Sequence, residues 1–280
     1  MDALARTRRW SRITAGVMLA LGLVGLGLAA ESAAQRNRSG FQFGPTNPPY
    51  DGQFTFCRIM FRNGRDGDGG NWAVDYPRAD LNFPFRLNQY TATPVNRDSR
   101  GEPRHMVVSL TDDRLFECPF VMMTEVGAAY IGPEEAARLR TYLLKGGFLW
   151  ADDFWGEYAW QHWVSAISEV LPPGEFPIVD LEPSHPLFHN FFEIREVPQI
   201  PSINFWFGSG GQTSERGSDS QEPHARAILN DHGRIMVLST HNTDIGDSWE
   251  REGDNREYFD RFATAGYAFG INVYIYAMTH

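Results

Sequence analysis

Short apolar runs that alternate with helical patterns are the feature that most constrains the fold. "FTFCRIMF" (54–61), "PFVMMTEVG" (119–127) and "FLWADD" (148–153) have the near-continuous hydrophobicity that is typical of buried strands. "GPEEAARLRTYLLKGG" (132–147) has a proline and acids in its first turn and ends at glycines, which is typical of a helix. This alternation predicts an α/β domain with a mainly parallel sheet.

The other apolar segments continue this alternation. In chain order we expect a helix at 79–91, a strand at 106–110, a helix at 156–171, a strand at 176–181, a hairpin at 225–241 and a long apolar helix at 257–280. Gly266 and Gly270 in the last helix are suited to close packing against a neighbour. Segments 62–71 and 206–223 have the composition of flexible loops. Because hydrophobic residues make up 42% of the chain and no internal repeat is evident, residues 53–280 are predicted to form a single domain.

The charged residues argue against several classes of function. The net charge of -10 and the lack of a basic block argue against binding to nucleic acid. Lys145 is the only lysine, and it precedes two glycines at a predicted helix end, where the helix dipole favours a cation. A Schiff-base lysine or a phosphate-loop lysine is therefore not expected. The motifs G-x-x-x-x-G-K-[ST], G-x-S-x-G, H-E-x-x-H and C-x-x-C do not occur, and no cofactor is evident.

The first 34 residues have the layout of a secretory signal peptide. A basic segment (6–12) precedes an apolar run (13–30), and small residues follow at 32–34. The pair Arg8-Arg9 suggests the twin-arginine route of bacteria. We expect cleavage and export, to the periplasm or otherwise out of the cytoplasm. The alternative, an uncleaved signal that anchors the chain, is the only membrane association that the sequence predicts.

The segment that follows the signal, residues 35–52, is rich in Asn, Gly and Pro and is predicted to be a flexible lead-in. Export would place Cys57 and Cys118 in a compartment that permits disulfides. Both lie in or beside apolar runs, where packing as a small apolar side chain is the common fate of cysteine. A disulfide stays open as the alternative, since the sequence does not give the Cα separation. Neither cysteine has a local setting that predicts a nucleophile.

Polar side chains follow three predicted strands at the point where each strand ends. Asp152 and Asp153 follow "FLWA", Glu125 follows "PFVMMT", and "STHNTDIGDSWE" (239–250) ends the hairpin. Ligands of parallel sheets bind outside the carboxyl ends of the strands, so these groups are expected to converge on one edge. Asp152 and Asp153 are candidates for a carboxylate base, a metal ligand or an acceptor for a polar ligand. The alternative is that they cap the next helix and bind loop amides.

His241 is the third candidate catalytic residue, because an imidazole near carboxylates suits acid–base chemistry or a metal. A turn built from Asn and Asp side chains is the alternative. Trp155 suits sugar stacking or helix packing, Arg78 suits anion binding or a salt-bridged loop, and Asp247 is interpreted as structural. The candidate ligand-binding residues are Glu125, Trp155, Glu157, Asn242, Asp244, Asp75 and Arg78.

Several separated blocks, from about Phe54 to the end of the chain, resemble the bacterial "domain of unknown function 4159" family. They are "FTFCRIMF…NWAVDYPRADLNFPFRL", "PFVMMTEVG…LRTYLLKGGFLWADDFWG", "SHPLFH", "MVLSTHNTDIGDSWE" and "FGINVYIYAMTH". The resemblance implies a flavodoxin-like, class I glutamine-amidotransferase-like three-layer sandwich with a mainly parallel sheet. It implies no reaction, since the activity of the family is not established.

Amidotransferases of this kind carry a nucleophilic cysteine at a strained strand-to-helix elbow. The corresponding segment of this chain holds Asp152 and Asp153 and has neither Cys nor Ser nearby, so cysteine-dependent amide hydrolysis is not expected. We therefore favour a non-catalytic exported module that binds a polar ligand, such as a carbohydrate, or a protein partner. The alternative is a hydrolase that uses Asp152 or Asp153 with His241, around a divalent metal.

Overall fold

The computed structural model describes residues 47–280. The predicted signal peptide and residues 35–46 of the predicted lead-in lie outside the described residues. The first described residue, Asn47, bonds the backbone of Val107 with both ends of its side-chain amide. Its Nδ2 donates to the carbonyl at 2.7 Å and its Oδ1 accepts from the backbone amide at 2.9 Å.

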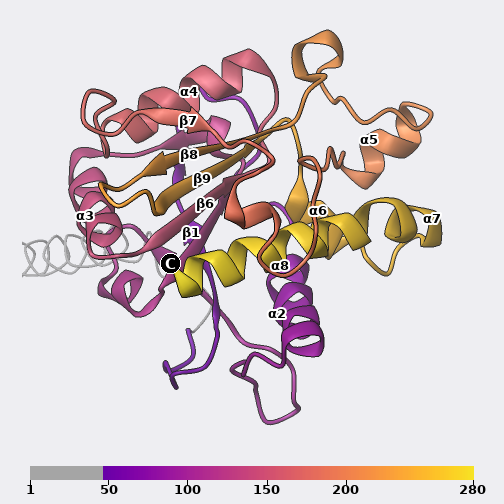
Figure 1. The fold of residues 1–280 in the computed structure, drawn as a ribbon, viewed down its shortest axis with the longest axis horizontal. Helices are drawn as coiled ribbons and strands as arrows, with labels where there is room; N and C mark the ends of the chain where they lie inside the picture. Colours follow the sequence, from indigo (N-terminus) through magenta and orange to yellow (C-terminus); the bar gives the residue numbers. More distant parts are fainter. Residues whose placement is uncertain (1–46) are drawn as a thin grey trace, which may run out of the picture. The chain divides into compact units, whose positions relative to one another are not determined.

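A seven-stranded, mostly parallel sheet forms the centre of the domain (Figure 1). Five adjacent strands of this sheet pair in parallel, and the two remaining strands pair antiparallel. The predicted α/β class is therefore confirmed. In spatial order the strands are β3 (His105–Ser109), β1 (Phe56–Met60), β4 (Phe120–Thr124), β6 (Phe148–Asp152), β9 (Ile235–His241), β8 (His224–Leu229) and β7 (Ile178–Asp180). A second, two-stranded sheet pairs β2 (Arg62–Asn63) with β5 (Ala129–Tyr130).

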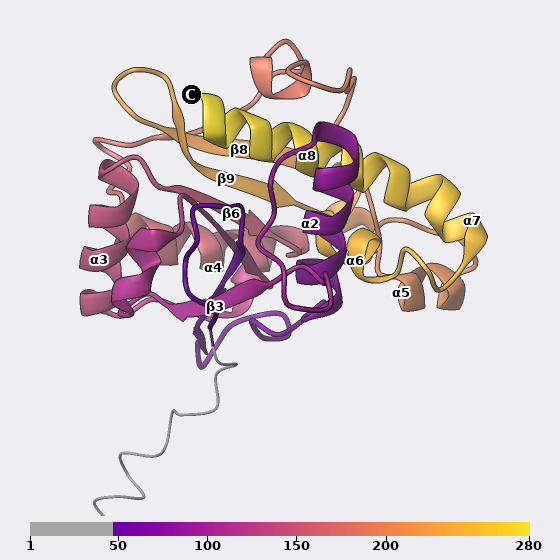
Figure 2. The same ribbon diagram turned by 90° about the horizontal axis from the view of Figure 1, so that it is seen from below.

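Helices cover both faces of the sheet, which gives three layers. Figure 2 shows α8 and α2 on one side of the strands and α3 and α4 on the other. The first face carries α2 (Arg78–Thr91), α6 (Ile245–Glu250) and α8 (Thr264–Thr279), and the second carries α3 (Pro133–Leu144) and α4 (Gly156–Ser168). The shorter helices are α5 (Ile203–Gly208), α7 (Arg256–Tyr258), the 3-10 turns η1 (Asp113–Glu117), η2 (Val126–Ala128), η3 (Pro186–Phe188) and η4 (Gly217–Ser220), and the π-helical turn η5 (Phe259–Ala263).

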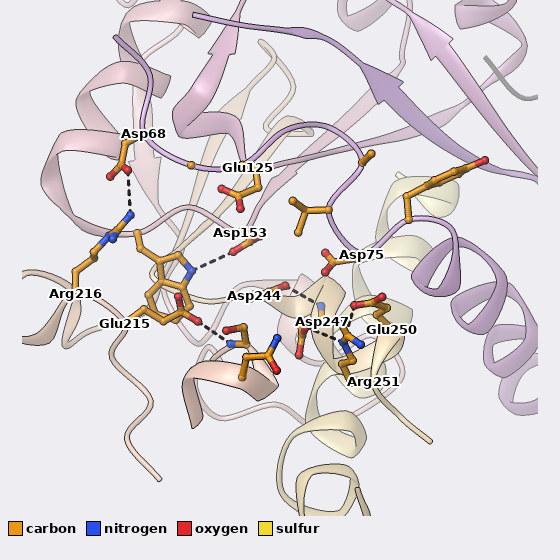
Figure 3. Close-up of a pocket in the computed structure, with 18 residues that line it drawn as sticks. Asp68, Asp75, Glu125, Asp153, Glu215, Arg216, Asp244, Asp247, Glu250 and Arg251 are labelled. Atoms are coloured by element: carbon orange, nitrogen blue, oxygen red, sulfur yellow. Dashed lines mark hydrogen bonds and ion pairs between the residues drawn. The ribbon is translucent and has the colours of Figure 1, made fainter. Parts of the chain in front are cut away.

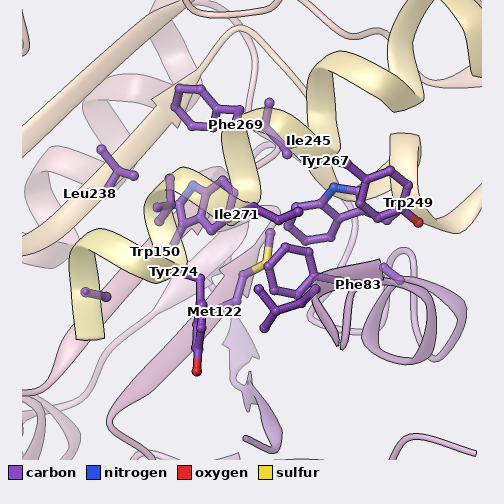
Figure 4. Close-up of a cluster of buried hydrophobic side chains, with 14 of the residues drawn as sticks. Phe83, Met122, Trp150, Leu238, Ile245, Trp249, Tyr267, Phe269, Ile271 and Tyr274 are labelled. Atoms are coloured by element: carbon purple, nitrogen blue, oxygen red, sulfur yellow. The ribbon is translucent and has the colours of Figure 1, made fainter. Parts of the chain in front are cut away.

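Aromatic side chains fill the core between the sheet and α8 (Figure 4). Trp249 on α6 packs edge-on against Trp150 of β6, with ring centroids 5.5 Å apart. A Cβ added at Gly270 would overlap the Trp249 indole, and one added at Gly266 would overlap the hydroxyl of Ser248. The predicted close packing at these two glycines is confirmed, because α8 lies directly against α6.

The second core lies beneath α3 and α4 and contains both cysteines, which form a disulfide. Their Cα atoms are 6.2 Å apart, because Cys57 lies on β1 and Cys118 lies just before the neighbouring strand β4. Of the two alternatives that the sequence left open, the disulfide is therefore the one that forms, and the two cysteines do not pack as separate apolar side chains. The sequence separation of 61 residues gave no sign of this proximity.

Two segments that were predicted to be flexible loops are bonded to the body of the domain. In 62–71, the backbone amides of Gly64 and Asp68 donate to carbonyls of η2 at 2.7 and 3.0 Å. The segment 206–223 contains the end of α5 and all of η4, and the Ser220 hydroxyl accepts from the Arg216 amide at 2.8 Å. Within residues 47–280, no helix is both long enough and apolar enough to cross a membrane.

Candidate functional site

An acidic cavity of about 610 Å³ opens at the carboxyl ends of the parallel strands (Figure 3). The segments that follow β4, β6 and β9 contribute to its wall, together with α6, the segment before α2 and residues on both sides of α5. Two arginines, Arg216 and Arg251, are its basic lining residues. Its eight acidic lining residues are Asp68, Asp75, Glu125, Asp153, Glu215, Asp244, Asp247 and Glu250. The predicted convergence of polar side chains on one edge of the sheet is thus present.

Three of these acids lie at positions where the backbone is left-handed. The φ angles are 64° at Asp75, 56° at Glu125 and 54° at Asp153. Glu125 directly follows β4 and Asp153 directly follows β6, so the chain turns sharply at the end of each strand. Non-glycine residues in this conformation are strained by roughly 1 kcal/mol or more, and they gather at functional sites. The surrounding structure must therefore hold these three carboxylates in place.

The two aspartates of "FLWADD" have different surroundings. Asp153 lines the cavity, and its Oδ1 accepts from the Trp155 indole at 3.0 Å. Asp152 lies outside the cavity lining: its Oδ1 accepts from the hydroxyl of Thr240, and its Oδ2 accepts from the Gly246 amide at 3.0 Å. Burial raises the pKa of Asp152 to about 7, although these hydrogen bonds oppose the shift. Asp152 thus joins β6 to β9 and to the first turn of α6.

Asp75, Asp153 and Asp244 form a group that we call the aspartate trio. Each offers one carboxylate oxygen, and these oxygens lie within 4.8 Å of one another. The three residues are only 5%, 5% and 3% exposed, and none forms an ion pair within residues 47–280. Burial, followed by repulsion from neighbouring carboxylates, raises the pKa of all three. Two unit charges 4.8 Å apart repel by roughly 3 kcal/mol at an effective dielectric constant of ~20.

Among residues 47–280, the Oδ2 atom of Asp75 is buried and has no hydrogen-bond partner. Asp153 and Asp244 each accept a hydrogen bond. Asp244 Oδ1 accepts from the Asp247 amide at 2.7 Å, and Asp153 Oδ1 accepts from the Trp155 indole. A buried carboxylate oxygen without a partner loses its hydration and gains nothing in return. A bound cation, or a proton on one of the carboxyl groups, would therefore stabilise the trio.

A second acidic group contains Asp75 again, now with Asp247 and Glu250 of α6. Here Arg251 supplies positive charge, with its Nε 2.8 Å from Glu250 Oε2 and 3.6 Å from Asp247 Oδ1. Asp247 Oδ2 also accepts from the Tyr258 hydroxyl at 2.7 Å and from a backbone amide at the start of α5. Asp247 and Glu250 are therefore largely satisfied by the protein itself, whereas Asp75 is not.

Arg58, which is completely buried, holds the segment that carries Asp75. Its Nε donates to Asp80 at 2.9 Å, and its Nη1 donates to the carbonyls of Trp72 and Val74 at 3.3 and 3.1 Å. The carbonyl of Val74 lies in the peptide that leads into Asp75. One guanidinium on β1 therefore joins α2 to the segment that forms this wall of the cavity.

Glu125 faces the same cavity, and burial raises its pKa to about 7. A hydrogen bond from the backbone of Gly70 opposes the shift. A Cβ at Gly69 or at Gly70 would overlap the Glu125 carboxylate in its present position, so the two glycines permit this close approach, and the φ of 132° at Gly69 itself favours glycine. Glu125 is thus a carboxyl group that can exchange a proton near neutral pH.

His241 lies on the other side of the segment between β6 and α4. Its Nε2 is 3.0 Å from the carbonyl of Gly156 and its Nδ1 is 3.1 Å from Arg226, while its ring stacks on Phe154. Burial lowers the pKa of His241 to about 4. Its ring nitrogens are thus engaged away from the aspartate trio.

Three other predicted ligand-binding residues also lie outside the cavity lining. Arg78 forms an ion pair with Asp254 at 2.7 Å near the surface. Glu157 is exposed and accepts from the Gln161 amide. Asn242 Oδ1 accepts from the Gly156 amide at 2.8 Å, so this side chain supports the start of α4.

Several lining residues were not among the predicted site residues. Asp247 and Glu250 lie three apart on α6, a spacing that places both on one face of a helix and that the sequence does show. Asp68, Glu215 and Arg216 come from the segments interpreted as flexible loops. Arg216 Nη2 lies 3.0 Å from Asp68 and closes the cavity wall between these two segments.

The fold and this site define an α/β domain with an acid-lined cavity at the carboxyl ends of its parallel strands. Residues 57–278 match the model of the family described as a domain of unknown function (DUF4159). The chain therefore belongs to this family, as the resemblance of its separated sequence blocks had indicated. No curated protein matches the chain.

Proposed function

We propose that the protein is an exported, non-catalytic module that binds a polar ligand through a positively charged group of that ligand. The observation that carries this proposal is the cavity itself, in which eight carboxylates face two guanidinium groups. A net negative, partly buried cavity concentrates cations and repels anions. Trp155 is buried and its indole NH is bonded to Asp153, which argues against sugar stacking and favours charge as the basis of recognition. Export rests on the predicted signal peptide.

The relation to the amidotransferase-like superfamily is part of this proposal. The parallel strands in the order β3-β1-β4-β6-β9 correspond to the 2-1-3-4-5 order of flavodoxin-like folds. Asp153, with a φ of 54°, occupies the strand-to-helix turn where such enzymes would carry a nucleophile. Both cysteines of the chain are bonded to each other. These observations support a related fold without thiol chemistry.

A thermal-shift series tests the charge of the ligand. Wild-type protein is mixed with spermidine, arginine, Ca²⁺ or Mn²⁺, and separately with maltose and citrate as neutral and anionic probes. We expect at least one cationic probe to raise the Tm, and we expect Asp244→Asn to reduce that shift. Glu157→Gln is the matched control, because Glu157 is exposed and lies off the cavity. No shift with any cationic probe would refute the proposal.

A carboxylate hydrolase is the second candidate, and Glu125 is the observation that favours it. Its pKa of about 7 suits a group that takes up and releases a proton during turnover, and it shares the cavity with Asp153. Such a hydrolase would use Glu125 and Asp153 in place of His241. Turnover on a panel of ester, amide and phosphoester substrates that is lost in Glu125→Gln would favour this candidate over the non-catalytic module.

A further inference from the structure

We propose that the aspartate trio, Asp75, Asp153 and Asp244, binds one divalent cation. This inference rests on the proposed function only in that both place the positive charge in the acidic cavity. It goes further because it names the ion class and the three residues that hold it.

The geometry of the trio fits a single ion. Oxygen ligands lie 2.3–2.6 Å from Ca²⁺ and 2.0–2.1 Å from Mg²⁺, so ligand atoms around one ion are at most about 5 Å apart. The trio offers one oxygen from each residue within 4.8 Å. The hydrogen bonds from Trp155 and from the Asp247 amide each use only the Oδ1 atom of their acceptor, and they fix the orientation of the two carboxylates.

An independent observation points to the same position. Asp75 is 5% exposed, lines the cavity and has a buried Oδ2 with no hydrogen-bond partner among the described residues. Arg58 bonds two backbone carbonyls of the segment that carries Asp75. The backbone is thereby held in place, and the Asp75 carboxylate stays at the cavity wall. A cation bonded to Oδ2 would satisfy this atom directly.

Charge distinguishes the trio from the neighbouring acidic group. Asp247 and Glu250 already have Arg251 within 3.6 and 2.8 Å, and Asp247 Oδ2 accepts two hydrogen bonds. The trio has no such basic side chain in the described part of the chain. A single external cation is therefore expected at the trio, while Arg251 serves the other group.

The donor atoms select the kind of ion. Three carboxylates, with neither histidine nor cysteine among them, favour hard cations such as Ca²⁺, Mg²⁺ and Mn²⁺ over Zn²⁺ or Cu²⁺. Water would complete the coordination shell from the side of the cavity. Because the ligands must be ionised, binding should strengthen as the pH rises and should release protons.

Metal binding to the full mature chain tests the inference. Chelator-treated protein is titrated with Mn²⁺, and bound ion is followed by calorimetry and by the electron paramagnetic resonance signal of free Mn²⁺. We expect one ion per chain, an affinity at least 100-fold lower in Asp75→Asn and in Asp153→Asn, and an unchanged affinity in Glu157→Gln. Glu250→Gln should weaken binding only a few-fold. Circular dichroism and the Tm establish that each variant is folded.

The outcomes separate this inference from the proposed function. One ion that is lost in Asp153→Asn and retained in Glu250→Gln supports it. One ion that is lost in Glu250→Gln and retained in Asp153→Asn overturns it, since the ion then belongs to the other acidic group. No Mn²⁺, Ca²⁺ or Mg²⁺ binding, together with a Tm shift by spermidine, overturns the metal site and leaves the proposed function standing. If neither metal nor amine binds, both are wrong.

Discussion

Removing one charge from the aspartate trio should make the cation-free protein more stable, in contrast to most substitutions of buried residues. Asn in place of Asp75 keeps the size of the side chain and tolerates the φ of 64°. The substitution forfeits no hydrogen bond at Oδ2, because that atom has no partner in the part of the chain that the structure describes. It removes the repulsion between position 75 and the two other carboxylates of the trio.

The magnitude follows from the separation of the charges. Each pair within 4.8 Å repels by roughly 3 kcal/mol at an effective dielectric constant of ~20. Arg58 and partial protonation reduce this repulsion, so we expect Asp75→Asn to raise the free energy of unfolding by about 2 kcal/mol at pH 8. For a domain of this size that corresponds to a Tm increase of about 4–8 °C. Because the pKa of all three carboxyls is raised by burial, the difference should shrink as the pH falls and the trio takes up protons.

Thermal unfolding in the presence of a chelator measures the effect. Asp80→Asn is the matched control, because Asp80 is equally buried and lies five residues away but is paired with Arg58. Breaking a buried pair by removing one partner typically destabilises by 3–5 kcal/mol, so the control should shift the Tm in the opposite direction. If Asp75→Asn lowers the Tm at pH 8, the carboxylates do not repel as argued and the reasoning about the trio fails.

Three further predictions concern the whole domain. Burial raises the pKa of Glu125, Asp152 and Asp247 in the folded state to between about 6 and 7. The folded state therefore retains protons that the unfolded chain releases near pH 4. In urea titrations with a chelator present, the free energy of unfolding should fall as the pH rises from about 4 to 7. Gly270→Ala should lower the free energy of unfolding by about 2 kcal/mol, as its methyl group meets the Trp249 indole, whereas Gly253→Ala has open space and should have little effect. The double variant Cys57→Ala/Cys118→Ala should lose about 4 kcal/mol, because the disulfide closes a loop of 61 residues, and an unchanged urea midpoint would contradict this.

The layout of the fold was predictable because local pattern and tertiary environment agree. The helix expected within 132–147 runs from Pro133 to Leu144, since proline, first-turn acids and closing glycines all mark its ends. The strand before Asp152 and Asp153 was equally clear from its apolar run. The edge of the sheet that carries the cavity followed from the parallel topology, which places the ends of these strands side by side.

The roles of individual side chains at that edge depend on details that the sequence shows only partly. In β6 the side chains of Phe148, Trp150 and Asp152 lie on the same face of the sheet, so Asp152 points toward α6 and α8. The left-handed φ of Asp153 turns the next carboxylate into the cavity. His241 follows the alternation of β9 to the face of α4. The disulfide and the contributions of Glu215 depend on contacts between segments that are distant in the chain, for which no local pattern exists.

The anchoring of Asp75 by Arg58 has a consequence for the speed of ion exchange. Because the guanidinium holds both the Val74 carbonyl and the α2 carboxylate of Asp80, the wall of the cavity would have little to rearrange on binding of the proposed ion. Exchange would then be limited by the loss of water from the ion and not by movement of the chain. Since Mg²⁺ gives up its water reluctantly, Ca²⁺ should enter and leave the trio much faster than Mg²⁺. A stiff cavity of this kind would respond to rapid changes in Ca²⁺ and would follow Mg²⁺ only slowly.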